Sequence, residues 1–502
     1  MGIKHFYSWF RKHETLKNSI TQSVPSEVDH LLIDMNGVIH EAAQRVFKYG
    51  KYAPKKTNII IPRRRLQKAR AAQNKIKTKT EPSFNDLYSC VKSEVNRLVD
   101  IARPQKTVYL AIDGVAPMSK QNQQRQRRFR AAKERAERSE DTFDSTCITA
   151  GTEFMWELAQ DLHKGEWLIS RNLLSIVISD DLVPGEGEHK LMEWIRHNDD
   201  NEGVYCVAGM DADLILLCCV LPKTHVYIMR EDELRAYDFI DINRVRQDLP
   251  VSAHDLLIWS CFIGNDFLPP IPSLEIKESA PEVGALDFLF ENYKRPLVNK
   301  NNGFLIIGEI CRLLALVRAR EQAIMEARHK DECAQEGAYN KRFPNKLWEG
   351  DIDKYRADYR KHKLERLHRG FCAYEMAHDF MKTVQWVYLY YTRGINATKA
   401  WNWFFPYNYT LHADAFVEYI KKRPHVSYGF QRTTPSHPHE QLLRVIPPAS
   451  KYLIPSYLHE YADSLAEKYT TFEIDMSGKR QEWEAVTVVD FVTLDENIVR
   501  TS

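Results

Sequence analysis

The sequence has no arrangement of cysteines that would hold a zinc ion or build a disulfide framework. Its nine cysteines include no Cys-x-x-Cys pair, and several of them lie within apolar runs. Such cysteines are typical of buried thiols in a reducing compartment. The chain also lacks an apolar run that approaches the length of a membrane span, and the opening segment 1–10 is too polar for a signal peptide. We therefore expect no membrane association.

The net charge is small, at +2, but the charges are unevenly distributed. Between Lys48 and Thr80 the sequence has twelve Lys or Arg and no Asp or Glu. This basic stretch 48–80 fits either a solvated loop or an accessory arm that contacts phosphates without reading base sequence. No internal repeat is present, and 502 residues are enough for more than one domain.

An acidic segment follows an apolar, β-branched run. Segment 173–178 has the pattern of a buried strand, a Pro-Gly pair then breaks the chain, and segment 190–196 has the pattern of an amphipathic helix. Glu186 and Glu188 therefore lie where a strand passes into a helix, at the carboxyl edge of a sheet. Open α/β sheets place their functional sites at this edge. Taken alone, the two acids would also fit a helix start stabilised by the helix dipole.

The same arrangement recurs along the chain. Three further strand-like segments, 31–33, 108–112 and 204–208, each lead into Asp residues, and a helical run at 254–262 precedes another. Each acid singly would fit a turn or a helix cap. The carboxylates expected to converge on one edge are Asp34, Asp113, Glu186, Glu188, Asp211, Asp213 and Asp266.

Seven converging carboxylates would oppose folding unless cations neutralised them. Ligands that are all oxygen suit Mg²⁺, with Mn²⁺ as the alternative ion. An acidic cluster that holds two hard cations is suited to in-line displacement at phosphorus. The sequence therefore predicts a phosphodiester-cleaving site with two metal ions.

A basic helix is predicted shortly after Asp113. Segment 120–138 contains no Gly or Pro. At helical spacing, one face of it carries Lys120, Gln124, Arg127 and Arg128. Three cations and an amide on one face form a compact anion pocket, because forked Arg donors match phosphate and Lys adds a point charge. The alternative is a generic basic helix exposed to solvent.

These motifs resemble those of the XRN-type 5′→3′ exoribonucleases, which degrade uncapped RNA, and they are nearer the cytoplasmic member than the nuclear one. The resemblance runs from Met1 to Trp483 and is carried by segments 33–40, 113–117, 183–190, 209–214 and 264–269. The β-rich carboxyl-terminal region of the cytoplasmic relative and the zinc knuckle of the nuclear relative are missing, so the chain resembles a compact form.

The resemblance implies an α/β fold of the PIN and flap-nuclease type. A mostly parallel sheet with flanking helices would be joined to a helical second block that roofs the site. The expected parts are a nuclease domain at 1–275, a charged helical connecting segment at 276–370, and the second block at 371–502. Within these parts, segments 303–320 and 364–391 have helical patterns. Asn408 departs from the family pattern, which usually has His there.

The resemblance also implies roles for individual residues. Lys120, Gln124, Arg127 and Arg128 would bind the terminal 5′-phosphate of the RNA. His40 would stack on the first base and pair with a Trp of the second block, for which Trp401 and Trp403 are both candidates. Stacking reads no sequence, because every base has a π-face. The alternative for these aromatic side chains is ordinary core packing.

The expected function is processive degradation of single-stranded RNA that carries a 5′-monophosphate, with nucleoside 5′-monophosphates as products. Such an enzyme would serve mRNA decay in the cytoplasm, with the nucleus as the alternative location, and decapping or other RNA-processing proteins are candidate partners. Two other hypotheses compete. A flap-type DNA endonuclease would share the acids, but the basic helix and the aromatic block argue against it. A non-catalytic RNA-binding protein would not need all seven acids.

Overall fold

The fold is that of a computed structural model. It describes residues 2–25, 27–53, 81–138, 143–165, 175–223, 225–232, 236–276, 284–334, 345–468, 471–479, 484–491 and 493–495. Most of the basic stretch 48–80, from residue 54 on, therefore lies outside the described residues. No helix in the described ranges is long and apolar enough to cross a membrane.

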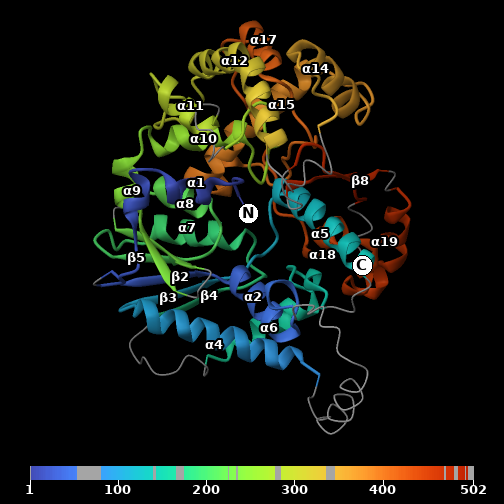
Figure 1. The fold of residues 1–502 in the computed structure, drawn as a ribbon. Coiled ribbons are helices and arrows are strands. Elements are labelled where there is room, and N and C mark those ends of the chain that lie inside the picture. Colours follow the sequence, from blue (N-terminus) through green and yellow to red (C-terminus); the bar gives the residue numbers. More distant parts are fainter. Residues whose placement is uncertain are drawn as a thin grey trace, which may run out of the picture.

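A seven-stranded sheet lies in the lower half of the molecule in Figure 1, with helices above and below it. Its strands are β1 (Ile20–Thr21), β2 (His30–Asp34), β3 (Thr107–Ala111), β4 (Ser175–Ser179), β5 (Tyr205–Ala208), β6 (Val226–Glu231) and β7 (Tyr237–Asp241). Their order is β1-β7-β6-β5-β2-β3-β4. The strands from β6 to β4 run parallel, whereas β7 and β1 are antiparallel to their neighbours. The predicted α/β class with a mostly parallel sheet is confirmed.

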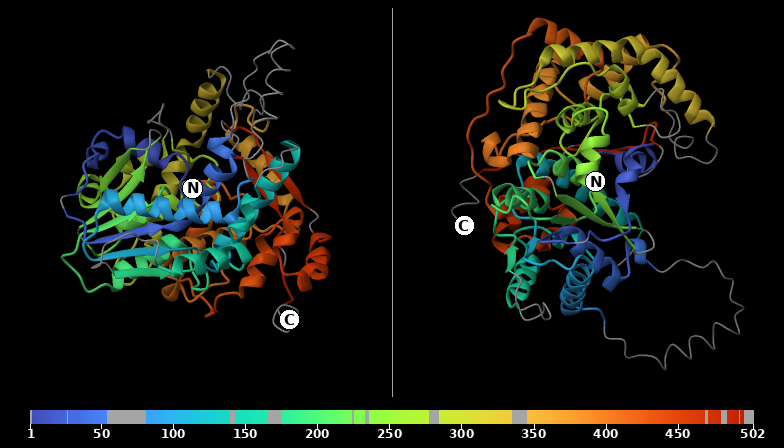
Figure 2. Two further views of the ribbon diagram at one scale, coloured as in Figure 1. Left: turned by 90° about the horizontal axis from the view of Figure 1, so that it is seen from below. Right: turned by 90° about the vertical axis from the view of Figure 1, so that its left-hand side faces the viewer.

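Helices cover both faces of the sheet, because buried parallel strands present apolar side chains on each side. In strand β2, Leu31 and Ile33 pack with α2 (Met35–Phe47), α4 (Phe84–Ala102) and α6 (Glu153–His163) in one core cluster. Leu32, between them, points to the opposite cluster. That second cluster includes side chains of α1 (Phe6–Lys12), α7 (Gly187–His197), α8 (Leu214–Cys219) and α9 (Ile242–Asp248). Figures 1 and 2 show these two helical layers on either side of the sheet.

A helical second block stands on the upper helical layer and shares its core. It contains α10 (Ala253–Ile263), α11 (Ala285–Asn292), α12 (Ile307–Ala334), α14 (Ile352–Tyr359), the π-helix η5 (Arg360–Glu365), α15 (Ala373–Arg393), α16 (Ile395–Thr398) and α17 (Ala413–Lys422). Beside it, α5 (Met118–Arg138) crosses the molecule and packs against α18 (Pro438–Val445) and β9 (Val486–Val489), which pairs with β8 (Phe472–Asp475). The predicted helical second block is therefore confirmed. From here on the name covers the residues from α10 on, and the predicted divisions at 275 and 370 stay predictions.

Short helices complete the described secondary structure. They are η1 (Leu16–Ser19), η2 (Gly50–Tyr52), η3 (Ser145–Cys147), η6 (Pro448–Leu453), η7 (Ser456–Leu458) and α19 (His459–Ala466).

Three local predictions were wrong. The strand predicted as buried at 173–178 is an edge strand, so the side chain of Ile176 is 41% exposed. The helix predicted at 303–320 begins at Ile307 and continues into the charged segment, since no Gly or Pro follows Gly308 before Ala334. The helix predicted at 364–391 begins only at Ala373, because Gly370 adopts a left-handed conformation with φ of 72° and breaks the chain there.

A buried carboxylate ties the second block together. Glu321 of α12 is 0% exposed and accepts hydrogen bonds from Ser273 Oγ at 2.7 Å and from Arg356 Nε at 3.1 Å, and its Oε1 lies 3.3 Å from His412 Nδ1. Burial by itself would raise the pKa of Glu321, but these partners outweigh it and lower the pKa to about 2. The ionised carboxylate is therefore stabilised only while all of these segments are in place.

We predict that Glu321→Gln destabilises the protein at pH 7 by about 3–5 kcal/mol, since it leaves the partly buried Arg356 without its buried counter-charge and with only the more exposed Asp353 and Asp414. A carboxyl group whose folded pKa is lowered stabilises the fold above its unfolded pKa, near 4.5, and this contribution is lost as the pH falls toward 2. The difference in melting temperature between wild type and variant should therefore shrink between pH 6 and pH 3.

The matched control is Asp353→Asn, which removes an exposed partner of the same Arg356. It should cost less than about 1 kcal/mol. Equal losses for the two variants would contradict the role assigned to Glu321.

Candidate active site

Six of the seven predicted carboxylates lie where neighbouring strands end. Asp34 is the last residue of β2, and Asp113 follows β3 by two residues. The remaining four of these, Glu186, Glu188, Asp211 and Asp213, follow β4 and β5. Because β4, β3, β2 and β5 are adjacent in the sheet, all six acids reach the same carboxyl edge. Asp266 reaches this edge from the loop after α10. The sequence had predicted that a helix, at 254–262, precedes this residue.

Hydrogen bonds fix the orientation of Asp113. Asn36 Nδ2 donates to Asp113 Oδ2 at 2.6 Å, and the backbone N–H of Asp113 donates to Asn36 Oδ1 at 3.1 Å. The backbone N–H of Gly187 donates to Asp113 Oδ1 at 2.6 Å. A Cβ atom at Gly187 would lie 3.1 Å from Asp34 Oδ1, so glycine permits this close approach. Asn36 was not predicted, although its place two residues after Asp34 was a usable signal.

The ammonium group of Lys120 lies among the acids. Its Nζ is 2.7 Å from Glu186 Oε2, 2.9 Å from Asp266 Oδ2 and 3.8 Å from Glu188 Oε1. Burial by itself would lower the pKa of Lys120, but the acids outweigh it, with Asp266 first, and raise the pKa well above its ordinary value. The structure therefore places Lys120 at the acidic edge.

Lys120 alone does not balance this many carboxylates. Ligand oxygens of Glu188, Asp211 and Asp213 lie within 4.8 Å of one another. Burial, and then Asp211 and Asp266, raise the pKa of Asp213 to about 6. No described donor reaches Glu188 Oε2 or Asp213 Oδ1, although both atoms are buried. Buried carboxylate oxygens without donors fit a hard divalent cation such as Mg²⁺ or Mn²⁺.

Two tyrosines of α15 cover the acids from the second block. Tyr390 donates from its hydroxyl to Glu186 Oε1 at 2.8 Å, and Tyr391 donates to Asp213 Oδ2 at 3.2 Å. The ring of His189, next to Glu188 in the chain, stacks on Tyr390 at 3.6 Å between centroids. Both tyrosines belong to segment 364–391, whose helical pattern gave no sign that two hydroxyls reach the acids.

A second, positively charged area lies further along α5. Arg128 is only 9% exposed; its Nη2 makes one long hydrogen bond, 3.4 Å, to the carbonyl of Ile148. Its Nη1 and Gln124 Oε1 have no hydrogen-bond partner among the described residues. Burial, and then repulsion from Arg127, lower the pKa of Arg128 to about 9. A buried guanidinium in this state is stabilised by a bound anion.

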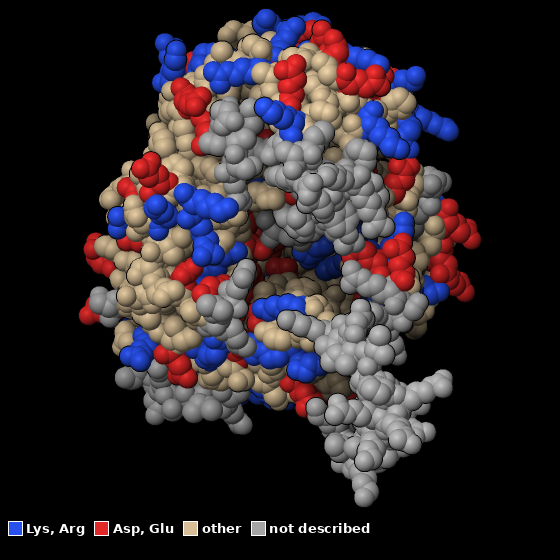
Figure 3. Space-filling model, viewed as in Figure 1, with Lys and Arg blue, Asp and Glu red and all other residues tan. Residues whose placement is uncertain are grey.

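His40 lies next to this basic area. Burial, followed by repulsion from Arg127 and Arg128, lowers the pKa of His40 to about 3. The imidazole is therefore neutral at physiological pH. Arg127 and Arg128, two of the four predicted phosphate ligands, act on it, and Gln124 lies one turn before Arg128 on α5. Figure 3 shows basic and acidic side chains inside a hollow at the centre of the face drawn in Figure 1.

The structure distinguishes the two tryptophan candidates. Trp403 donates from Nε1 to Thr383 Oγ1 at 3.0 Å, and Lys382 Nζ lies 4.0 Å from its ring centroid, so packing within the second block occupies this ring. Trp401 accepts a hydrogen bond at its carbonyl from the N–H of Met118, the first residue of α5, at 2.7 Å. Within the described ranges, the ring of Trp401 makes no contact with another aromatic ring or with a cation.

Comparisons with known proteins cover nearly the whole chain. The model described as "XRN 5′-3′ exonuclease N-terminus" matches residues 1–232, and the model described as "Xrn1 helical domain" matches residues 248–346 and 319–499. The chain is 26% identical to human 5′-3′ exoribonuclease 1, over 98% of the chain and 33% of that protein. It is 27% identical to the Drosophila melanogaster 5′-3′ exoribonuclease 2 homolog, over 93% of the chain and 64% of that protein.

The chain thus spans between one third and two thirds of the length of these two relatives. Among solved structures, the catalytic core of Rad2 in complex with DNA substrate aligns with 93% of the chain and 99% of its own length, at 12% identity and a TM-score of 0.34.

We predict that divalent cations stabilise the protein through the acid cluster. Saturating Mn²⁺ or Mg²⁺ should raise the melting temperature of the wild type, by the equivalent of about 2–3 kcal/mol at a hundredfold excess over Kd. EDTA should reverse the shift. In EDTA, Asp213→Asn should be more stable than the wild type by on the order of 1–2 kcal/mol, since it removes one of the repelling charges.

In Asp213→Asn the shift with Mn²⁺ should be much smaller than in the wild type. Asp463→Asn, which changes an exposed acid paired with Lys451, is the matched control and should behave as the wild type in both conditions. If neither ion changes the melting temperature of the wild type, there is no metal site at these carboxylates.

Proposed function

Because the chain belongs to the XRN 5′-3′ exonuclease family, we propose that it is a 5′→3′ exoribonuclease for single-stranded RNA with a 5′-monophosphate. It would release nucleoside 5′-monophosphates processively and serve mRNA decay in the cytoplasm. The observation that carries the proposal is the buried guanidinium of Arg128, which has an unpaired Nη1 and lies on the same helix as Lys120. One helix thus joins an anion pocket to the acidic edge.

This arrangement supports cleavage at a fixed distance from the 5′ end. Lys120 and Arg128 are eight residues apart on α5, so their Cα atoms are separated by about 12 Å along the helix axis. Arg127, Arg128 and Gln124 would hold the terminal phosphate, and Lys120 would face the phosphodiester at the acids. A rigid helix between the two positions lets the bound end select the bond that is cut.

The acids suit two divalent ions. Glu188, Asp211 and Asp213 would hold one, and Asp34, Asp113 and Glu186, with Asp266 nearby, would hold the other. Bound Mg²⁺ or Mn²⁺ would supply an activated water and stabilise the leaving 3′-oxygen. The protein contributes orientation, because Asn36 and Gly187 fix Asp113 and the hydroxyls of Tyr390 and Tyr391 fix Glu186 and Asp213.

Base stacking would hold the strand without selecting its sequence. The imidazole of His40 is neutral, so it presents a flat surface and no charge to a base. Trp401 lies at the start of α5, on the side of the second block. Successive bases between these two rings would be held by their π-faces, which all bases share.

We predict that RNA with a 5′-monophosphate is degraded rapidly and that the same RNA with a 5′-triphosphate or 5′-hydroxyl is degraded slowly. A hydroxyl leaves the buried Arg128 without its anion, and a triphosphate is too large for a closed pocket. Arg128→Gln should slow the monophosphate substrate by about 100-fold, in line with removal of one partner of a buried charge pair. The measurement is the initial rate for each end group with Mg²⁺.

Lys133→Gln removes a charge elsewhere on α5 and is the matched control.

Asp211→Ala should abolish cleavage of every substrate and leave RNA binding largely intact. A DNA duplex with a single-stranded flap is included as a further substrate. Preferential cleavage of that flap, or equal rates for the three RNA ends, would favour a flap-type endonuclease instead.

We further predict that one tryptophan variant changes the rate of RNA degradation and the other changes the stability of the fold. Trp401→Ala should lower the rate on RNA about 10-fold, as expected for loss of one stacking contact, with little change in melting temperature. Trp403→Ala should instead destabilise the protein by about 2–4 kcal/mol, because its ring and indole N–H are engaged in packing. The opposite assignment of the two effects would show that Trp403 is the stacking residue.

A further inference from the structure

One aromatic ring of α7 contacts both tyrosines that cover the acids. The imidazole of His189 stacks on Tyr390, with 3.6 Å between the ring centroids and 11° between the ring planes. The same imidazole lies edge to face with Tyr391, at 5.2 Å and 79°. The two tyrosine rings lie 6.3 Å apart at 77°, so they face in different directions along α15. His189 therefore constrains both members of the pair at once.

His189 contacts its surroundings through its ring rather than through hydrogen bonds. The side chain is buried, and neither Nδ1 nor Nε2 has a hydrogen-bond partner among the described residues. Stacked and edge-to-face aromatic pairs are favourable beyond the area that they bury. The two aromatic contacts are therefore what this side chain contributes to the site.

The two tyrosines reach carboxylates that follow different strands. Tyr390 donates to Glu186 after β4, and Tyr391 donates to Asp213 after β5. Strands β2 and β3 lie between these two strands in the sheet. Each hydroxyl lies at the far end of a rigid ring, so a tilt of the ring displaces the hydroxyl and weakens its hydrogen bond, which depends on distance and angle.

Other rings also border Tyr390, but the stack on His189 is closer and more nearly parallel. Trp386, one turn earlier on α15, lies 4.9 Å away at 38°, and Phe267 lies 6.0 Å away at 76°. Glu186 is the N-cap of α7, three residues before His189, and positions three apart lie on one side of a helix. Helix α7 thus carries both the ring that supports Tyr390 and the carboxylate that its hydroxyl binds.

We propose that His189 is a positioning residue whose ring holds Tyr390 and Tyr391 in place. The two hydroxyls then orient Glu186 and Asp213 toward the divalent ions, in the way that outer hydrogen-bond partners orient metal ligands. The proposal rests on the proposed function, which assigns these two carboxylates to different ions. His189 would therefore influence both ion sites through one ring, without itself binding an ion.

The test measures the affinity of the full chain for Mn²⁺ by isothermal titration calorimetry, without RNA and well below the melting temperature of each variant. His189→Ala removes the ring and should weaken Mn²⁺ binding about tenfold. His189→Phe keeps a flat ring and should stay within about threefold of the wild type. If His189→Ala is unfolded, His189→Leu takes its place, because it fills the site without a flat ring, and the same loss is expected.

A second measurement asks whether the effect passes through the hydroxyls. In the double variant Tyr390→Phe with Tyr391→Phe, both hydrogen bonds to the acids are already absent. Adding His189→Ala to this background should weaken Mn²⁺ binding by about twofold or less, since residues that act through one another are not additive. A full tenfold loss in both backgrounds would overturn the proposal.

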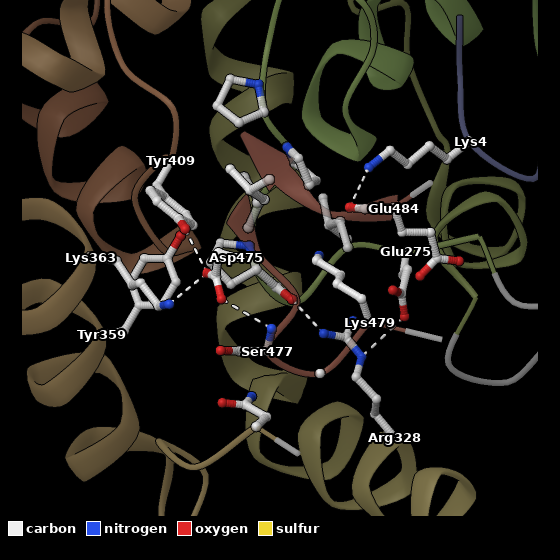
Figure 4. Close-up of a pocket in the computed structure, with 18 of the residues that line it drawn as sticks. Lys4, Glu275, Arg328, Tyr359, Lys363, Tyr409, Asp475, Ser477, Lys479 and Glu484 are labelled. Carbon is white, nitrogen blue, oxygen red and sulfur yellow. Dashed lines mark hydrogen bonds and ion pairs between the residues drawn. The ribbon is translucent and has the colours of Figure 1, made fainter. Parts of the chain in front are cut away.

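Two controls carry similar contacts away from the acids. In the group drawn in Figure 4, Tyr359 packs edge to face on Tyr409, whose hydroxyl donates to Asp475. Tyr409→Phe therefore removes a hydrogen bond to a carboxylate outside the seven acids. His254 Nδ1 lies 2.9 Å from the hydroxyl of Tyr388 on α15, so His254→Ala removes a histidine that packs on the same helix. Both variants should bind Mn²⁺ as the wild type does.

The remaining outcomes separate this inference from the proposed function. Wild-type Mn²⁺ affinity in His189→Ala would overturn the role of His189, as would an equal loss in folded His189→Phe or in either control. Degradation of 5′-monophosphate RNA by the wild type would then still support the proposed function. A wild type that degrades no RNA, with Mn²⁺ affinities as expected for every variant, would refute the proposed function and leave the role of His189 standing.

Discussion

Lys120 holds one positive charge among the carboxylates of Glu186, Glu188 and Asp266, and this crowding of like charges constrains the rest of the molecule. Burial raises the pKa of Asp34 and Glu188 well above ordinary values, and Asp113 and Asp213 respectively raise them further. A site of this kind persists only if a surrounding framework is stable enough to hold it. The parallel strands, the continuous upper core and the tyrosines of α15 supply that framework.

Helix α5 shows how the framework serves two positions at once. Its first turn is tied to the second block, where the N–H of Met118 meets the carbonyl of Trp401 and Ser119 donates to the carbonyl of Trp403. Further along, Arg125 donates from Nε to the carbonyl of Asp490, so the helix is also anchored near the end of the chain. The acids and the basic area around Arg128 therefore cannot move independently, although they come from different parts of the sequence.

Local patterns in the sequence were enough for the sheet and for the set of acids, because strand periodicity and strand ends are encoded over a few residues. Asp34, Asp113, Asp211 and Asp213 each follow an apolar strand, and the structure brings them together as that rule requires. The position of Lys120 among the acids was not predictable, since its partner Asp266 is 146 residues away. The same holds for Tyr390 and Tyr391, whose apolar neighbours indicate core while their hydroxyls depend on tertiary contacts. The exposure of Ile176 depends on β4 being the last strand of the sheet, which no local pattern specifies.

The roof of the site has a consequence for how the chain is made. Arg393 at the end of α15 follows Asp213 by 180 residues, and until α15 emerges the upper core and the acidic edge lack their cover. At roughly 5–20 residues per second, this interval lasts about 10–40 s during synthesis. The nascent nuclease layer therefore spends that time with an open apolar face beside unneutralised acids. During that interval the exposed apolar face can be bound by chaperones or cleaved by proteases. The face and the acids become covered only when the second block has been synthesised and packs on them.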